Sequence, residues 1–406
     1  MQSSSQALLA RQPIYNQALE VYAYELLFRG DASSLNAEFS CGDKATSQVI
    51  LNAFGEAGLE SICGQHPAFI NFTKNLILDL PPFDPKHYVI EILEDIEVDD
   101  DLISALKAAK KAGAQLALDD FILDKNSAPL LTMVDIVKVD VLALTHEQIE
   151  RFAKVFIPRN LVLLAEKVET HEMYQFCKDL GFQLFQGYFL SRPQIVEGKS
   201  MPDSKVVVLR LIKEMQDPEI SVTQLTQILS QDPQMSYKLL KLVNSAAFAR
   251  ISKCTSLQQA ITLLGLAHIR SWATLLALGN LDDKPMALRQ ASLERAILCE
   301  KIGREMKEFP AHDYYTVGLF SLLDAFLDRP ILEIIKSLQL PSNMEEALVS
   351  GNSSLGLSLD TARCFQEGRL ADIQTERLIQ YGLDVETMDQ LYKASLQEAD
   401  QQVHAL

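Results

Sequence analysis

Short apolar runs that end in an acidic residue recur through the first half of this chain. Val89-Ile90 precedes Glu91, Leu116-Ala117-Leu118 precedes Asp119, and Leu163-Leu164-Ala165 precedes Glu166. Amphipathic stretches such as 101–112 lie between such runs, and this alternation is typical of βα units around a parallel sheet. We expect strands at 21–28, 68–73, 88–93, 115–121, 136–141, 161–167 and 182–187. The first half is therefore predicted to be an α/β domain of the barrel type.

A parallel barrel brings the carboxyl ends of its strands to one mouth, so these acids are expected to converge. Mg²⁺ and Mn²⁺ prefer oxygen ligands. Lys138, in the run Ile136 to Asp140, would add a positive charge beside them. The candidate ligands by position are Glu25, Asn71, Glu91, Asp119, Asp120 and Glu166.

Helix capping is the alternative interpretation, because Asp and Glu are favoured at helix N-termini. It suits any one of these acids taken alone. Adjacent Asp119 and Asp120 repel each other, however, and two like charges at a strand end usually need a cation or a shared proton. As a set, the acids favour a metal site over capping.

The second half of the chain has a different pattern. We place the barrel domain at 6–193, a linker rich in polar residues, Pro and Gly at 194–204, and a helical domain at 205–400. Polar helix starts such as Ser221, Asp232-Pro233 and Ser256 are followed by apolar faces, and proline is favourable at a first helical position. This half is predicted to be all-α.

Composition excludes some classes of function. The net charge of -17, without a run of Lys and Arg, opposes binding to duplex nucleic acid. No signal-like N-terminus and no bilayer-length apolar span is visible, so we expect a cytoplasmic protein with no membrane partner. The 6 cysteines have no CxxC spacing, which indicates neither a zinc site nor a disulfide framework.

A collinear series of motifs in the first half resembles the EAL family of cyclic di-GMP phosphodiesterases. The series begins with Arg11-Gln12-Pro13-Ile14 and Tyr24-Glu25-Leu26-Leu27-Phe28-Arg29, with Leu26 where the family name has Ala. It continues through Ile70-Asn71-Phe72-Thr73, Glu91-Ile92-Leu93-Glu94, Asp119-Asp120-Phe121, Lys138-Val139-Asp140, Ala165-Glu166-Lys167-Val168-Glu169-Thr170, and Gln186-Gly187-Tyr188 with Pro193.

The resemblance implies a modified TIM-like barrel that hydrolyses cyclic di-GMP to pGpG with two Mg²⁺ or Mn²⁺ ions. It implies that Glu166 accepts the proton of the attacking water and that Lys138 positions this water. Gln12, Arg29 and Gln186 would contact the substrate. The implied metal ligands are Glu25, Asn71, Glu91, Asp119 and Asp120.

Three departures from the family pattern bear on activity. Ile122-Leu123-Asp124-Lys125 stands where active members carry a Gly- and Ser-rich loop that orders the metal site and couples dimer partners. Lys167 stands where Gly is usual, and the segment from Asn71 to Glu91 is shorter than usual. A homodimer is a possible partner state, and the loop that couples dimer partners in the family is altered here.

The second half resembles the HDOD family of all-α output or interaction domains. The resemblance rests on Asp232-Pro233, Asn244-Ser245, Ser256-Leu257 and the run from Ala260 to Gly265. We interpret His312-Asp313 as a helix start, Asn244 as a cap or turn residue and Trp272 as a core residue.

EAL followed by HDOD resembles a class of two-domain bacterial signalling proteins, the YuxH-like group. Two functions follow. The first is a phosphodiesterase whose non-catalytic HDOD half regulates it or binds an unidentified protein partner. The alternative is a catalytically inactive cyclic di-GMP receptor or scaffold that acts through its HDOD half.

Overall fold

The computed structural model describes residues 8–29, 58–80, 84–93, 96–119, 129–194, 202–217, 219–244, 254–279, 281, 283–338 and 340–405. The chain divides into two compact units. The first comprises residues 1–190 with Phe365–Asp372, and the second comprises 191–364 with 373–406. Each unit is described by itself.

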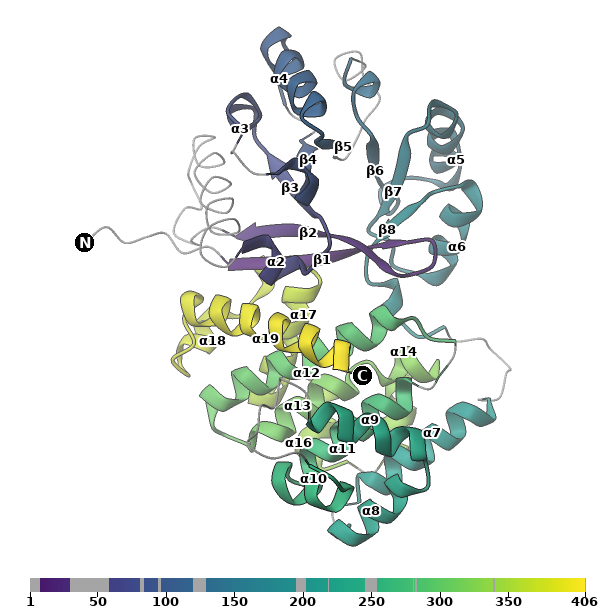
Figure 1. Ribbon diagram of the computed structural model, residues 1–406, viewed down its shortest axis with the longest axis vertical. Coiled ribbons are helices and arrows are strands. Elements are labelled where there is room, and N and C mark those ends of the chain that lie inside the picture. The colour runs from purple at the N-terminus through teal and green to yellow at the C-terminus, as the bar shows by residue number, and fades with distance from the viewer. Residues whose placement is uncertain are drawn as a thin grey trace, which may run out of the picture. The chain divides into compact units, whose positions relative to one another are not determined.

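The first unit is a closed eight-stranded barrel in which each strand pairs with its neighbours in chain order (Figure 1). The strands are β1 (Leu8–Asn16), β2 (Val21–Arg29), β3 (Ala68–Phe72), β4 (Tyr88–Ile92), β5 (Gln115–Leu118), β6 (Ile136–Asp140), β7 (Val162–Glu166) and β8 (Leu184–Gln186). Strands β2 to β8 pair in parallel, whereas β1 is antiparallel to both β2 and β8. The predicted α/β barrel is confirmed, and the reversed strand makes it a modified one.

Strand β1 is the element that the sequence pattern does not predict. Its residues do not alternate strictly between apolar and polar types, and Pro13 lies inside it. Proline lacks an N–H donor and so argues against a strand with two partners. The pairing of β1 explains why Pro13 is tolerated, because β8 pairs only with Ile14 to Asn16 while β2 pairs along the whole strand.

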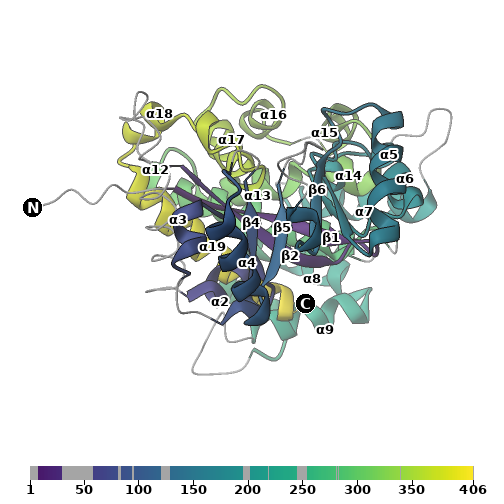
Figure 2. The same cartoon turned by 90° about the horizontal axis from the view of Figure 1, so that it is seen from above.

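Helices connect the strands and lie outside the barrel (Figure 2). They are α2 (Gly58–Cys63), α3 (Lys74–Leu78), α4 (Asp100–Lys111), α5 (His146–Phe156) and α6 (His171–Leu180), with 3-10 turns η2 (Pro85–His87), η3 (Leu130–Thr132), η4 (Ile157–Arg159) and η5 (Phe189–Ser191). In α4, Leu102, Leu106 and Ala109 are buried while the acids and lysines of the other face are exposed, as the helical spacing predicts.

The second unit is helical throughout the part of it that the structure describes, which confirms the predicted all-α half. Its helices are α7 (Asp203–Met215), α8 (Val222–Ser230), α9 (Pro233–Val243), α10 (Leu257–Leu264), α11 (Leu266–Gly279), α12 (Met286–Met306), α13 (Ala311–Phe320), α14 (Leu323–Leu327), α15 (Ile331–Leu338), α16 (Ser342–Val349), α17 (Ser354–Gln366), α18 (Thr375–Ile379) and α19 (Val385–Ala405). The last two residues of α17 and the 3-10 turn η7 (Leu370–Asp372) belong to the first unit.

The predicted helix starts of this half have the expected capping geometry. Ser221 and Ser256 each accept a hydrogen bond from the backbone N–H three residues later, and Asp232 does the same for Met235. Pro233 is the first residue of α9. No helix within the described ranges has the length and apolar content needed to cross a bilayer.

Candidate active site

The interior of the barrel is built in layers. Each strand contributes one buried apolar residue to a common cluster, which consists of Ile14, Ala23, Phe69, Val89, Ala117, Ile136, Leu164 and Leu184. Side chains two positions apart on a strand point to the same face. The residues two positions further toward the mouth therefore also face inward, and they are Gln12, Glu25, Asn71, Glu91, Asp119, Lys138, Glu166 and Gln186. For β1, which runs in the opposite direction, the step is two residues back.

The apolar layer thus forms the floor of a polar site at the carboxyl ends of the parallel strands. This is the end at which barrel enzymes carry their catalytic groups. Seven parallel strands and one reversed strand each place a residue of this set at the same level. The set contains every candidate site residue from the sequence except Arg29 and Asp120.

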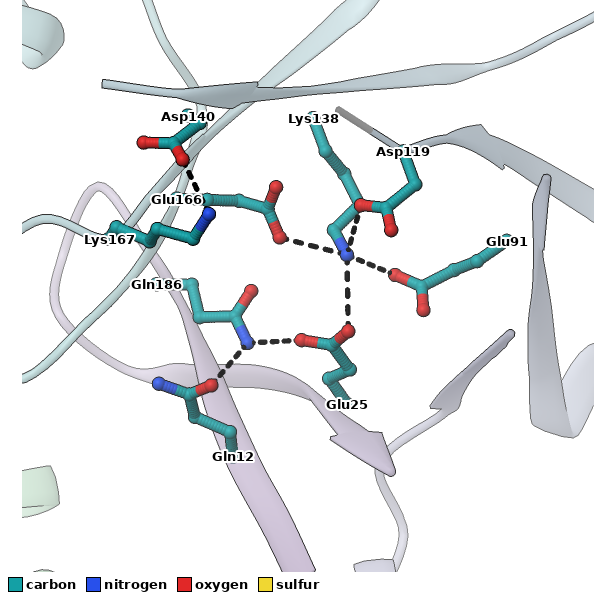
Figure 3. Close-up of polar contacts among 9 residues, drawn as sticks. All are labelled: Gln12, Glu25, Glu91, Asp119, Lys138, Asp140, Glu166, Lys167 and Gln186. Carbon is teal, nitrogen blue, oxygen red and sulfur yellow. Dashed lines mark hydrogen bonds and ion pairs between the residues drawn. The ribbon is translucent and has the colours of Figure 1, made fainter. Parts of the chain in front are cut away.

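Lys138 lies at the centre of this site (Figure 3). Its Nζ atom is 2.7 Å from Glu91 Oε1, 2.8 Å from Glu166 Oε1, 2.9 Å from Asp119 Oδ1 and 3.2 Å from Glu25 Oε1. Lys138 is 1 % exposed and Glu91 is fully buried. Four carboxylates from four different strands therefore converge on one buried positive charge.

Burial and mutual repulsion perturb the pKa values of these groups. Burial raises the pKa of Glu91 well above its ordinary value, against the attraction of Lys138, and nearby Glu25 and Asp119 raise it further. Burial also raises the pKa of Glu166, to about 8. Burial lowers the pKa of Lys138, but the surrounding carboxylates outweigh this and raise it well above its ordinary value. The site thus contains more negative charge than one ammonium neutralises.

Gln186 connects the acids to strand β1. Its Nε2 donates hydrogen bonds to Glu25 Oε2 and, at 3.0 Å, to Gln12 Oε1. Gln12 of β1 and Glu25 of β2 are direct partners in the β1–β2 register. Gln186 of β8 is the partner of Ile14 in the β1–β8 register. The reversed strand therefore completes the polar layer and closes the ring around Lys138.

Helix capping does not account for Glu91 or Glu166. The helices that follow these strands are capped by other side chains, namely Asp99 for α4 and Thr170 for α6. Glu91 Oε1 pairs with Lys138 at 2.7 Å, and Oε2 lacks a hydrogen-bond partner in the described part of the chain. The capping alternative is therefore wrong for these two acids.

The donor set fits divalent ions by its chemistry. Buried oxygens without a hydrogen-bond partner among the described residues include Asn71 Oδ1, Glu91 Oε2 and Gln186 Oε1. Buried acceptors of this kind are normally satisfied, and hard cations take such oxygens as ligands. The carboxylates turn toward Lys138 here, and within the described ranges no three Asp, Glu, His or Cys side chains are already grouped as a metal centre.

Two candidate residues and the altered loop lie at or beyond the edges of the described segments. Arg29 is the last residue of β2, but its side chain lies outside the described set. Asp120 and the loop residues Ile122 to Lys125 lie outside the described residues.

Two positions at the rim have unusual backbone geometry. Lys167 has φ of 55°, in the left-handed region, which accounts for the family's usual Gly at this position; its Nζ pairs with Asp140 (Figure 3). Gly187 has φ of 143°, and a Cβ atom there would lie 2.1 Å from the carbonyl oxygen of Val168. The motif Gln186-Gly187 thus needs Gly for a close backbone approach, a requirement that residue spacing does not reveal.

The candidate residues of the helical half have structural surroundings. Asn244 donates to the carbonyls of Leu240 and Cys254 and accepts from the Cys254 N–H, which ties the end of α9 to the start of the next helical segment. Trp272 is 2 % exposed in the core. His312 is the second residue of α13, with Nε2 3.2 Å from Asp313. The structural interpretations of Asn244 and Trp272 are confirmed.

Together these features define a class of protein: a modified (β/α) barrel with a ring of acids around a buried lysine, followed in the chain by an all-helical domain. The EAL domain model matches residues 58–193, and the HDOD domain model matches residues 201–326. The chain belongs to the family in which an EAL domain is followed by an HDOD domain, as the motifs indicate.

Two relatives match nearly the whole chain. The uncharacterized protein YuxH of Bacillus subtilis is 36 % identical over 356 residues, which cover 84 % of this chain and 86 % of YuxH. The cyclic di-GMP phosphodiesterase CdgJ of Vibrio cholerae is 32 % identical over 389 residues, covering 94 % of this chain and 90 % of CdgJ. Among solved structures, Klebsiella pneumoniae BlrP1, in a calcium and cyclic di-GMP complex, is 24 % identical over 48 % of this chain and 58 % of its own, with a TM-score of 0.39.

Proposed function

We propose that this protein is a cyclic di-GMP phosphodiesterase whose barrel hydrolyses cyclic di-GMP to pGpG. The observation that carries this proposal is the convergence of four carboxylates on Lys138 at the carboxyl end of an EAL-type barrel. CdgJ, a relative named as a cyclic di-GMP phosphodiesterase, aligns with 94 % of the chain and supports the same activity. A site with this excess of buried acid is suited to a phosphodiester only when cations offset its charge.

Two divalent ions, Mg²⁺ or Mn²⁺, would supply that charge, polarise the phosphodiester and generate the attacking hydroxide. The residues that would hold them are Glu25, Asn71, Glu91, Asp119 and Asp120. Those that the structure describes belong to the one polar layer at the carboxyl ends of the strands.

The remaining residues of the layer have separate roles in this proposal. Glu166 accepts the proton of the attacking water. Lys138 orients this water and stabilises charge that develops on the phosphate oxygens. Gln12, Gln186 and Arg29 hold the nucleotide, and the Gln186 amide already links Gln12 to Glu25.

The helical half acts in this proposal as a non-catalytic regulatory and protein-binding module. The HDOD match supports this role. Its His268 Nε2 lies 3.5 Å from Glu300 Oε1, and the hydrogen bond that the imidazole donates to this carboxylate raises the pKa of His268. The partner protein and a possible homodimer belong to the same proposal.

Metal binding is tested by thermal unfolding of the full chain in EDTA, Mg²⁺ and Mn²⁺. An ion that binds only the folded barrel stabilises it by about 2.7 kcal/mol at one hundred times its Kd, so a clear rise in Tm is expected. Glu91→Gln should abolish most of this rise, because it replaces a buried carboxylate whose Oε2 has no hydrogen-bond partner among the described residues. Glu150→Gln is the control, since Glu150 pairs with Lys154 on the surface of α5.

Equal Tm values with and without either ion, also in the presence of cyclic di-GMP, would contradict the metal site. That result would favour the receptor or scaffold function.

A further inference from the structure

A cavity of about 170 Å³ lies within the helical unit, between α9, α11, α12 and α19. Its apolar wall consists of Leu275, Leu276, Met286, Leu293 and Val403. Met286 is 58 % exposed, so this side chain stands at the rim where the cavity meets solvent. An apolar cavity of roughly 150 Å³ is large enough to hold a benzene-sized molecule. The space therefore admits an apolar group of about six carbon atoms.

Two basic side chains, Lys238 from α9 and Arg289 from α12, complete the lining. Among the described residues the lining contains no acid, and neither cation forms an ion pair with a carboxylate there. Arg289 Nε is buried and has no hydrogen-bond partner among those residues, and burial lowers the pKa of the guanidinium. Two cations thus share an apolar cavity in a chain whose net charge is -17.

Gly279, the last residue of α11, leaves space for the Arg289 guanidinium. A Cβ atom at this position would lie 3.0 Å from Arg289 Nη1 and 3.2 Å from its Cδ. The missing side chain therefore lets Arg289 lie against the end of α11 and face the cavity. A helix C-terminus favours a nearby cation, but this compensates only part of the cost of a half-buried charge.

We propose that this cavity binds a small amphipathic carboxylate. The carboxylate group accepts hydrogen bonds from Arg289 and Lys238, and an apolar body of about six carbons contacts Leu275, Leu276 and Leu293. Arginine binds a carboxylate with two parallel N–H donors, and such charge-assisted bonds are stronger than neutral ones. The site lies within the helical unit and is independent of the proposed hydrolysis, so the regulatory half has a ligand of its own.

Titration calorimetry of the full chain with hexanoate and benzoate tests this proposal. Saturable binding is expected, at least ~10-fold tighter than binding of hexanol and of inorganic phosphate, because each of these lacks one half of the recognised chemistry. Arg289→Gln should weaken hexanoate binding at least ~10-fold. Lys241→Gln, an exposed lysine on the same helix as Lys238, should leave it unchanged.

Two further variants separate loss of the ligand site from loss of folding. Lys238→Gln changes a half-buried side chain and should weaken binding without changing Tm in the absence of ligand. Gly279→Ala should weaken binding by displacing the guanidinium. The proposal is overturned if neither acid binds saturably, if hexanol binds as tightly as hexanoate, if phosphate alone binds as tightly, or if Arg289→Gln binds hexanoate like the parent chain.

Discussion

Glu166→Gln is expected to slow hydrolysis of cyclic di-GMP by about 10²- to 10⁴-fold, the usual contribution of a general base. Gln keeps the size of the side chain but cannot accept the proton of the attacking water. Glu166 ends β7 beside Lys138, at 2.8 Å, and is not one of the five proposed metal ligands. Binding of metal and nucleotide should therefore change much less than turnover, so kcat should fall while the Kd for cyclic di-GMP stays within a few fold.

Glu172→Gln is the matched control for this change. Glu172 is an exposed acid in the first turn of α6, outside the ring around Lys138. Single-turnover kinetics of both variants separate chemistry from binding. A Glu166→Gln protein that turns over at the parental rate would remove Glu166 from the role of base.

Lys138→Met is expected to produce a large loss of stability in the barrel. Removal of one partner of a buried ion pair costs about 3–5 kcal/mol, and here one ammonium compensates four carboxylates. The carboxylates can respond by binding protons. Because burial already holds the pKa of Glu91 and Glu166 above their unfolded values, protonation of these acids stabilises the folded barrel at low pH. The deficit of the variant should therefore grow as pH rises through neutrality.

Native-state hydrogen exchange in peptides from β4 to β7 measures this loss in the barrel itself. Lys154→Met is the control, since Lys154 is exposed and pairs only with Glu150 in the described part of the chain. Added Mn²⁺ or Mg²⁺ should restore part of the lost protection, because a divalent ion replaces the missing positive charge. A Lys138→Met barrel with parental protection at pH 8 in EDTA would contradict the charge balance described for this site.

The sequence alone predicts most of the barrel because its signals are local and repeated. Apolar runs that end in Glu91 and Glu166 place these acids at strand ends, and a barrel brings strand ends together. Residues two positions apart on a strand point to the same face, so the polar layer follows from the apolar floor. Val89 leads to Glu91 in this way, and Ile136 leads to Lys138. The position of Lys138 in the middle of an apolar run also predicts acidic neighbours, because a lysine is rarely fully buried unless it is paired with an acid.

Other features depend on contacts between distant residues, which local patterns do not contain. Strand β1 is hidden by Pro13 and by weak alternation, and only its pairing with β2 and β8 makes it a strand. The need for Gly187 comes from the approach of the Val168 backbone, nineteen positions earlier in chain order. The cavity of the helical unit joins Lys238 and Arg289 from separate helices, and no spacing in the sequence relates them.

The central claim is tested most directly by measuring pGpG release from cyclic di-GMP by the purified full chain in Mn²⁺ and in Mg²⁺. The parent chain and Glu25→Ala are compared, because Glu25 is a proposed metal ligand on β2 that contacts both Lys138 and Gln186. The proposed function predicts metal-dependent pGpG release by the parent chain that disappears in Glu25→Ala and in EDTA. No release by the parent chain in either metal, or equal release by Glu25→Ala, would contradict it.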